Sequence, residues 1–226
     1  MSFQSPVSGL KHRQCVAASI TAGTALALAL ALTPTTATAQ GASQALPLAA
    51  RTKGSATAPV TVYEMADFQC PVCRKFAVEM WPTLEKQFIA TGKVRWIYIM
   101  FPLPSIHANA VAAATFAACA ATEGKFWPTH DMLFATQQAW EKLKDPAPFF
   151  QSKVAGLGLK AESMNACLQS GAGTAMVRDD ASGAERSGAN STPSFYIEGG
   201  MMAGLYPLEV YQRILDSVWK AKSTKG

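Results

Sequence analysis

The sequence lacks the charge patterns that nucleic-acid-binding proteins show. It has no block of like charges and no stripe of basic residues interleaved with aromatic ones. Proteins that bind nucleic acids concentrate Lys and Arg to neutralise phosphates, so nucleic acid is not an expected partner. The formal net charge of +5 is modest and says little about other partners.

Residues that bind metals are also scarce. The chain has 3 histidines and 5 cysteines, and the only closely spaced cysteines are Cys70 and Cys73. Zinc sites are usually built from two closely spaced ligand pairs, whereas His107 and His130 lie far apart in the sequence. We therefore expect no metal site and no cofactor. No internal repeat is present either.

The N-terminal segment has the features of a secretory signal peptide. Lys11 and Arg13 precede an uncharged stretch over residues 16–32, and small residues follow as far as Ala39. We expect residues 1–39 to be this signal, with cleavage near Ala39. The alternative is a membrane anchor, but the strongly apolar core is shorter than the ~20 residues that a span needs. Cys15 precedes that core and would be discarded with it.

Removal of residues 1–39 would take away two basic residues, Lys11 and Arg13, so the formal charge would fall from +5 to +3. Four cysteines would remain, an even number that allows two disulfides in an oxidising compartment. The remaining chain is long enough for one well-buried domain, or for a domain with an insertion.

The first half of the remaining chain alternates between extended and helical patterns. Residues 40–58 are small and polar without apolar periodicity, which predicts a flexible tether. Residues 59–68 are rich in β-branched and aromatic side chains and predict a strand. Residues 74–81 can continue a helix, and residues 94–101 read as a buried strand. A strand, a helix and a strand in this order predict a parallel pair.

The next ninety residues are expected to be helical. Separate helical patterns cover residues 107–122, 126–139, 147–155 and 161–168. No strand pattern interrupts them.

A second set of strand signals follows. Residues 194–197 and 201–203 predict a hairpin with a two-glycine turn at Gly199 and Gly200. A last helix is expected after Pro207, with an apolar stripe along one face. One sheet that is built from both ends of the chain requires the helices between them to form an inserted subdomain.

The Cys70-Pro71-Val72-Cys73 motif indicates redox chemistry, although the spacing alone is a weak signal because zinc sites and static disulfides share it. Its place between a strand and a helix strengthens the prediction. Cys70 would face the free N–H groups and positive dipole end of the helix, which stabilise a thiolate, and is predicted to be the reactive thiol. Cys73, one turn into the helix, is predicted to be the resolving thiol.

Several motifs together resemble the DsbA-like family of secreted thiol:disulfide oxidoreductases, which have the thioredoxin fold. The resemblance covers about residues 59–220 and rests on the sequence around Cys70, on Phe101-Pro102-Leu103, on Gly124-Lys125-Phe126-Trp127 with His130-Asp131, and on Thr192-Pro193-Ser194-Phe195. It implies an α/β thioredoxin-like domain over residues 59–103 and 190–226, with an inserted helical subdomain over residues 104–189.

The resemblance also implies a second part of the site, at Thr192 and Pro193. In the family a cis-proline faces the disulfide and offers backbone groups to an extended substrate. The alternative is an ordinary proline that opens a strand. The dipeptide Pro71-Val72 departs from the Cys-Pro-His-Cys motif of the best-known oxidase. Without that histidine, stabilisation of the Cys70 thiolate is expected to rest on the helix terminus and the backbone, and the direction of catalysis stays open.

Glu64 is a candidate supporting residue. It lies six residues before Cys70, on the same strand face as Val62 and Ala66. In thioredoxin-like folds an acid at this offset lies beneath the disulfide and assists proton transfer to the buried cysteine. No basic partner is evident, so burial is expected to raise its pKa. The alternative is a carboxylate that reaches solvent at the end of the strand.

Cys119 and Cys167 lie in separate predicted helices among small or apolar residues, and we expect them to form a structural disulfide. The alternative is two buried free thiols.

These features predict an exported oxidoreductase that introduces disulfides into cysteine-containing unfolded or extended proteins and is recycled by a membrane redox partner. A monomer is expected because residues 40–58 are too short to form a dimerisation domain. A reductase or isomerase is the alternative within this class. A non-catalytic exported binding protein of the same fold is the alternative outside it.

Overall fold

The computed structural model describes residues 48–224, so the expected signal peptide lies outside the described residues. None of the helices between Leu48 and Thr224 combines the length and hydropathy that are needed to cross a bilayer.

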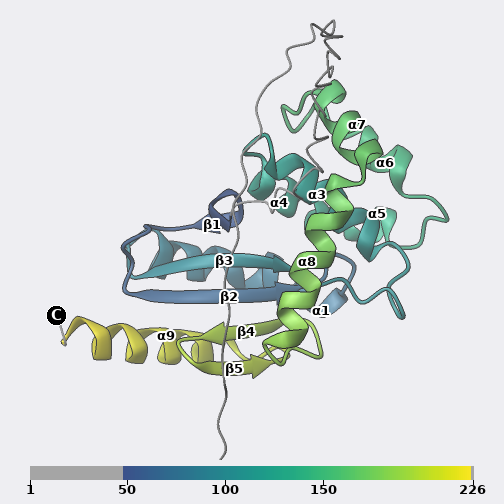
Figure 1. The fold of residues 1–226 in the computed structure, drawn as a ribbon. Coiled ribbons are helices and arrows are strands. Elements are labelled where there is room, and N and C mark those ends of the chain that lie inside the picture. The colour runs from purple at the N-terminus through teal and green to yellow at the C-terminus, as the bar shows by residue number, and fades with distance from the viewer. Residues whose placement is uncertain (1–47, 225–226) are drawn as a thin grey trace, which may run out of the picture. The chain divides into compact units, whose positions relative to one another are not determined.

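The strands of the described residues form one mixed sheet in the order β1-β3-β2-β4-β5 (Figure 1). These strands are Thr52–Lys53 (β1), Val60–Ala66 (β2), Val94–Met100 (β3), Ser194–Ile197 (β4) and Gly200–Ala203 (β5). The central pair, β2 and β3, is parallel, whereas β1, β4 and β5 each run antiparallel to their neighbours. The sheet is therefore built from both ends of the described chain, as a thioredoxin fold with an insertion requires.

The two faces of β2 are buried against different helices, because successive side chains of a strand point to opposite faces. Val60 and Val62 pack with the helix that follows Cys70 and with α9 (Leu208–Ser223). Met65 lies on the opposite face, against Ala184 of α8 (Ala172–Arg186). The sheet is therefore a buried middle layer.

The helix that begins after Cys70 contains two π-helical turns, one within it and one at its end. It consists of Pro71–Lys75 (α1), Phe76–Met80 (η2), Trp81–Leu84 (α2) and Glu85–Ile89 (η3), of which η2 and η3 are the π-helical parts. Pro82 has no backbone N–H, so a regular α-helical ladder cannot continue unbroken through it. The π-turn of η2 ends at Met80, two residues before this proline, which is where such changes of helical register are expected.

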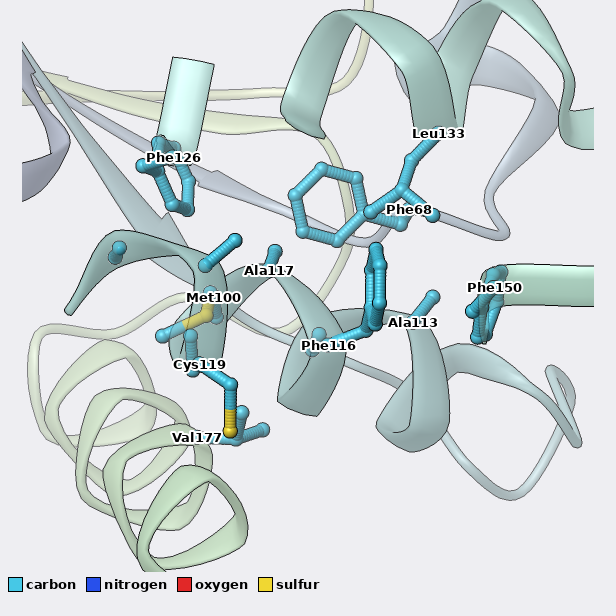
Figure 2. Packing of buried hydrophobic residues seen from close by; sticks show 14 of the residues in the cluster. Phe68, Met100, Ala113, Phe116, Ala117, Cys119, Phe126, Leu133, Phe150 and Val177 are labelled. Atoms are coloured by element: carbon cyan, nitrogen blue, oxygen red, sulfur yellow. The ribbon is translucent and has the colours of Figure 1, made fainter. Parts of the chain in front are cut away.

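Helices fill the chain between β3 and β4 (Figure 1). They are Ala110–Ala121 (α3), Phe126–Ala135 (α4), Gln137–Trp140 (α5), Ala147–Gln151 (α6), Ala161–Ser170 (α7) and α8. The sequence patterns did not single out α8, whose mixed small and charged residues form only a narrow apolar stripe. Figure 2 shows how α3 supplies Ala113, Phe116 and Ala117 to the core of this helical layer.

The C-terminal hairpin turns one residue earlier than the sequence suggested. Glu198 and Gly199 form the turn, and Gly200 already pairs with Ile197 as part of β5. Both turn residues have positive φ, 46° for Glu198 and 97° for Gly199. Two successive positive φ angles are the requirement of the tight turns that match the twist of a hairpin. The prediction of a two-glycine turn was therefore wrong.

The flexible tether predicted for residues 40–58 is also wrong for its described part. Leu48–Arg51 (η1) forms a 3-10 helix, and β1 pairs with β3 at the edge of the sheet. Arg51 is buried, and its guanidinium Nη1 contacts the carboxylate of Asp180 on α8. Arg51 and Asp180 are 129 residues apart in the sequence, so local composition could not predict their contact.

Candidate redox-active site

Cys70 occupies the position directly before the first turn of α1. Its backbone is extended, with φ −68° and ψ 122°, and Pro71 follows as the first helical residue. Proline suits this place because its fixed φ is helical and its missing N–H would have had no partner there. The Cys70 N–H donates to the carbonyl of Asp67 at 3.1 Å, and the Cys70 carbonyl accepts from the N–H of Arg74 at 3.0 Å. The sulfur of Cys70 is thereby held at the open end of the helix.

Cys70 and Cys73 are not joined by a disulfide in this structure, and both are buried. The pKa of Cys70 is lowered from 9.0 to about 6, chiefly because the Cys73 thiol donates a hydrogen bond to the Cys70 thiolate. Burial opposes this effect, while Thr192 and the backbone N–H groups of Val72 and Cys73 add to it. Cys70 is therefore a thiolate at neutral pH.

Cys73 has the opposite character. It is completely buried, and burial raises its pKa well above 9.0. Its hydrogen bond to Cys70, the negative charge of Cys70 and the charge of Glu64 raise the pKa further. The neighbouring thiols thus divide into an ionised, helix-terminal sulfur and a protonated, buried one.

The Thr192 backbone lies beside the Cys70 sulfur, although these two residues are 122 positions apart in the sequence. The Thr192-Pro193 peptide bond is cis. The Cys70 thiol lies 3.5 Å from the carbonyl oxygen of Thr192, to which it donates when protonated. Within residues 48–224 the buried Thr192 hydroxyl has no other hydrogen-bond partner, so it is free to donate to the Cys70 thiolate. Thiolate stabilisation thus rests on side chains as well as on the backbone, contrary to the expectation from the Pro71-Val72 dipeptide.

Glu64 lies on β2, on the face that carries Val62 toward the redox helix. Its carboxylate is buried, and Oε2 accepts a hydrogen bond from the Trp96 indole Nε1 at 2.8 Å. Burial raises its pKa to about 8, although the bond from Trp96 works against this rise. The alternative of a carboxylate that reaches solvent is excluded. Glu64 is protonated over much of the neutral range and electrostatically coupled to Cys73.

The structure joins Cys119 of α3 and Cys167 of α7 by a disulfide, with Cα atoms 5.7 Å apart. Gly173 of α8 approaches this bond so closely that an added Cβ would lie 2.7 Å from the Cys119 sulfur. The disulfide therefore lies where three helices of the insertion meet.

The two histidines that were weighed as metal ligands have separate surroundings. His107 Nδ1 lies 2.7 Å from the buried Asp67 carboxylate. His130 is buried among aromatic rings, with Nδ1 2.8 Å from Asp131, and burial lowers its pKa. In the part of the chain that the structure describes, no cluster of three His, Cys, Asp or Glu side chains could hold a metal ion.

Sequence reasoning missed the side chains that hold the segment before Cys70. Asp67 accepts hydrogen bonds from the backbone of Gln69 and Leu103, and Gln137 donates to the carbonyls of Phe68 and Cys70. Asp67 stands in the motif around Cys70 and could have been singled out. Gln137 belongs to no motif. A glutamine in a helix is usually exposed, so nothing in the sequence indicated that Gln137 is buried.

Comparison with known proteins places this geometry in a family. A family model described as Thioredoxin matches residues 49–217. The Na(+)/H(+) antiporter NhaA 3 of Salinispora tropica is 30% identical over 167 residues, which are 74% of this chain and 24% of the antiporter. The chain thus spans about a quarter of the length of that relative. A Bacillus anthracis protein named "Probable disulfide bond formation protein D" is 28% identical over 152 residues, 66% of this chain and 69% of that protein.

Among solved structures, alpha-DsbA1 of Wolbachia pipientis has a similar fold. It superposes with a TM-score of 0.69 at 22% identity, and the match covers 77% of this chain and 93% of that one. The fold is therefore a thioredoxin fold with the helical insertion of DsbA structures. From the family match, the sheet order and the placement of the cysteine pair, the chain belongs to the DsbA-like thioredoxin-fold family.

Proposed function

We propose that this chain is an exported thiol:disulfide oxidoreductase that introduces disulfides into cysteine-containing unfolded or extended proteins. The observation that carries the proposal is the contrast between Cys70, with a pKa of about 6, and Cys73, whose pKa burial raises well above 9.0. A thiolate that is stabilised in the reduced enzyme makes that enzyme form more favourable, so the oxidised form passes its disulfide on readily.

The exchange has two steps. A substrate thiolate attacks the Cys70 sulfur of the oxidised enzyme, which breaks the Cys70–Cys73 bond and forms a mixed disulfide with Cys70. Cys73 leaves as a thiolate and takes up a proton. A second substrate thiolate then attacks the substrate sulfur of the mixed disulfide and displaces the Cys70 thiolate. The substrate loses two electrons, and the enzyme gains them.

Glu64 is proposed to supply or accept the proton that Cys73 exchanges. Within residues 48–224 its carboxyl accepts a hydrogen bond on one oxygen, from Trp96, and its charge acts on Cys73. A group with a pKa of about 8 can hold a proton at neutral pH and release it without a large penalty.

Thr192 and Pro193 are proposed to receive the substrate backbone beside Cys70. The 3.5 Å between the Thr192 carbonyl oxygen and the Cys70 sulfur supports this role, because a substrate bonded to Cys70 would bring its own backbone close to that of Thr192. Export, reoxidation by a membrane redox partner and a monomeric state complete the proposal. The name of the Bacillus anthracis relative, which refers to disulfide bond formation, favours the oxidising direction over the reductase or isomerase alternative.

The test is the equilibrium of the Cys70–Cys73 couple with a glutathione buffer, together with the oxidation of a reduced unfolded protein. An oxidase is expected to have a potential well above that of thioredoxin, which is about −270 mV. A value near that of thioredoxin would reverse the direction and favour a reductase.

Two variants separate catalysis from binding. Cys73→Ser is expected to trap a mixed disulfide between Cys70 and a substrate, whereas Cys70→Ser is expected to trap none. A wild-type protein that neither oxidises nor reduces any thiol substrate would favour the non-catalytic binding protein instead.

A further inference from the structure

The short helix α5 approaches the segment that leads into Cys70. Gln137, at the start of α5, is 1% exposed. Its side-chain Nε2 donates to the carbonyl of Phe68 at 2.7 Å and to the carbonyl of Cys70 at 3.1 Å. One amide group of the helical insertion therefore holds two carbonyls of the segment that precedes the redox helix.

Two further amides extend this contact along the same strip of backbone. Gln69 donates through Nε2 to the carbonyl of Glu141 at 2.8 Å and accepts the backbone N–H of Asn109 at 2.6 Å. The Asn109 side chain in turn donates to carbonyls between Trp140 and Leu143, the nearest at 2.8 Å. The segment before Cys70 and the end of α5 are thus tied together by side-chain amides.

The side chain of Phe68 secures the same segment from the other side. Figure 2 shows its ring among Leu133, Phe126 and Phe116, within the core of the helical insertion. Phe68 is 1% exposed, so its backbone is buried with it. Within residues 48–224, the hydrogen-bond donor to the Phe68 carbonyl is the Gln137 amide. Without that donor, a buried carbonyl would be left unpaired, which is unfavourable.

We propose that Gln137 is a positioning residue for Cys70, and that its amide holds residues 68–70 so that the Cys70 sulfur faces the N–H groups at the start of α1. The helical insertion is, on this view, part of the machinery that sets the reactivity of Cys70. The inference rests on the proposed redox role of the cysteine pair. It adds a residue that neither the Cys-x-x-Cys motif nor the cis-proline segment contains.

The geometry supports a specific role rather than general packing. The Cys70 carbonyl accepts from the Arg74 N–H inside the helix and from Gln137 outside it. This bifurcated acceptance fixes the orientation of the peptide group between Cys70 and Pro71. Because that peptide group leads into the first turn, a rotation there would turn the Cys70 sulfur away from the N–H groups of Val72 and Cys73.

The experiment replaces Gln137 by leucine, which has similar volume and no donor. The control is Gln212→Leu on α9, since the Gln212 amide also donates a hydrogen bond, in this case to the Gln87 side chain at the surface. Ionisation of Cys70 is followed in the reduced proteins by thiolate absorbance and by the alkylation rate as pH changes. The equilibrium of each protein with glutathione is measured beside it.

For Gln137→Leu, the ionisation midpoint of Cys70 is expected to rise by about 0.5 to 1 pH unit, the scale of one hydrogen bond. The glutathione equilibrium is expected to shift about three- to tenfold toward a weaker oxidant, because a tenfold change corresponds to one unit of thiol pKa. Gln212→Leu is expected to change neither. An unchanged midpoint and equilibrium in folded Gln137→Leu would overturn the inference.

Gln137→Glu provides a second test if the leucine variant fails to fold. A protonated glutamic acid can still donate one hydrogen bond, whereas its carboxylate would repel both carbonyls and the Cys70 thiolate. The Cys70 midpoint is therefore expected to rise above that of the wild type, and an unchanged midpoint would again overturn the inference. An ordinary, high midpoint in the wild type would count against the proposed function, whereas only the difference between variants and wild type bears on Gln137.

Discussion

The indole Nε1 of Trp96 donates a hydrogen bond to the buried carboxylate of Glu64 at 2.8 Å, and this is the one side-chain bond that the Glu64 carboxylate makes in the described residues. The other oxygen, Oε1, is buried without a partner. An acid in such surroundings favours its neutral form, which explains the direction of its pKa shift. The raised pKa of Glu64 must therefore make the free energy of unfolding depend on pH.

Glu64→Gln is expected to flatten that pH dependence in the oxidised protein. The folded-state pKa of Glu64 is about 8 against an ordinary 4.5, so between these values the folded state holds a proton that the unfolded chain has lost. The free energy of unfolding therefore falls as pH rises, by up to about 1.4 kcal/mol per pH unit, and glutamine removes this slope. Urea unfolding at several pH values measures it. The same slope in both proteins would contradict the assignment.

The Glu64→Gln experiment requires the oxidised protein because the titration of Cys70, which occurs only in the reduced protein, changes the free energy of unfolding in the opposite direction. Its pKa falls from 9.0 to about 6 on folding, so between these values the reduced folded protein has lost a proton that the unfolded chain retains. The free energy of unfolding of the reduced protein therefore gains a rising contribution over this range. Reduced and oxidised proteins are expected to diverge in stability as pH increases from 6.

Thr192→Val is expected to raise the pKa of Cys70. Valine has the shape of threonine but no hydroxyl to donate to the thiolate. The change is expected to be about 0.5 to 1 unit, which the pH dependence of Cys70 alkylation would show. Thr61→Val on β2 is a matched control, since the Thr61 side chain is remote from the cysteines along the strand. An equal shift in both variants would show that the Thr192 hydroxyl has no specific role.

Asp180→Asn is expected to destabilise the protein strongly. The asparagine oxygen can still accept the N–H of Met100, which Asp180 accepts at 2.9 Å, but the buried Arg51 guanidinium would lose its charged partner. Breaking a buried ion pair on one side costs about 3–5 kcal/mol. Chemical denaturation measures the loss. The double variant Arg51→Met with Asp180→Asn is expected to recover part of it, and a single variant within 1 kcal/mol of wild type would refute this account, on the scale just given.

The Cys119–Cys167 disulfide is expected to stabilise the fold by about 4 kcal/mol, because its cysteines are 48 residues apart and close a long loop. When Cys70 and Cys73 are both replaced by serine, Cys119–Cys167 is the disulfide that remains within the described residues. Unfolding of that protein with and without reductant measures its contribution. Stability that does not depend on reductant would show that the bond is absent in solution or that the chain gains nothing from it.

Much of the fold follows from local patterns. The β-branched and aromatic residues of β2, the run of apolar residues in β3 and the apolar stripe on α9 are local signals, so the strands and the last helix were predictable. The placement of Cys70 was predictable for the same reason, since a strand followed by Pro71 and a helix puts Cys70 at the helix terminus. The hairpin turn was displaced by one residue because Glu198, rather than a second glycine, adopts positive φ.

Other features depend on residues that are far apart in sequence. The sequence around Arg51 does not predict that this residue is buried. Its ion pair with Asp180 of α8 holds the segment before β2 against the fold. Trp96 was expected as a strand residue, but its bond to Glu64 follows from the register of two strands.

The amino-acid sequence by itself determined which thiol lies at the helix terminus, because the end of a strand, Pro71 and the start of a helix are local properties. The tertiary structure decided which distant groups lie beside the Cys70 residue. Thr192 and Gln137 reach Cys70 from segments 122 and 67 residues away in the chain. Hydrogen bonds act over about 3 Å, and only the packing of the helical insertion and the sheet brings such distant groups within that range.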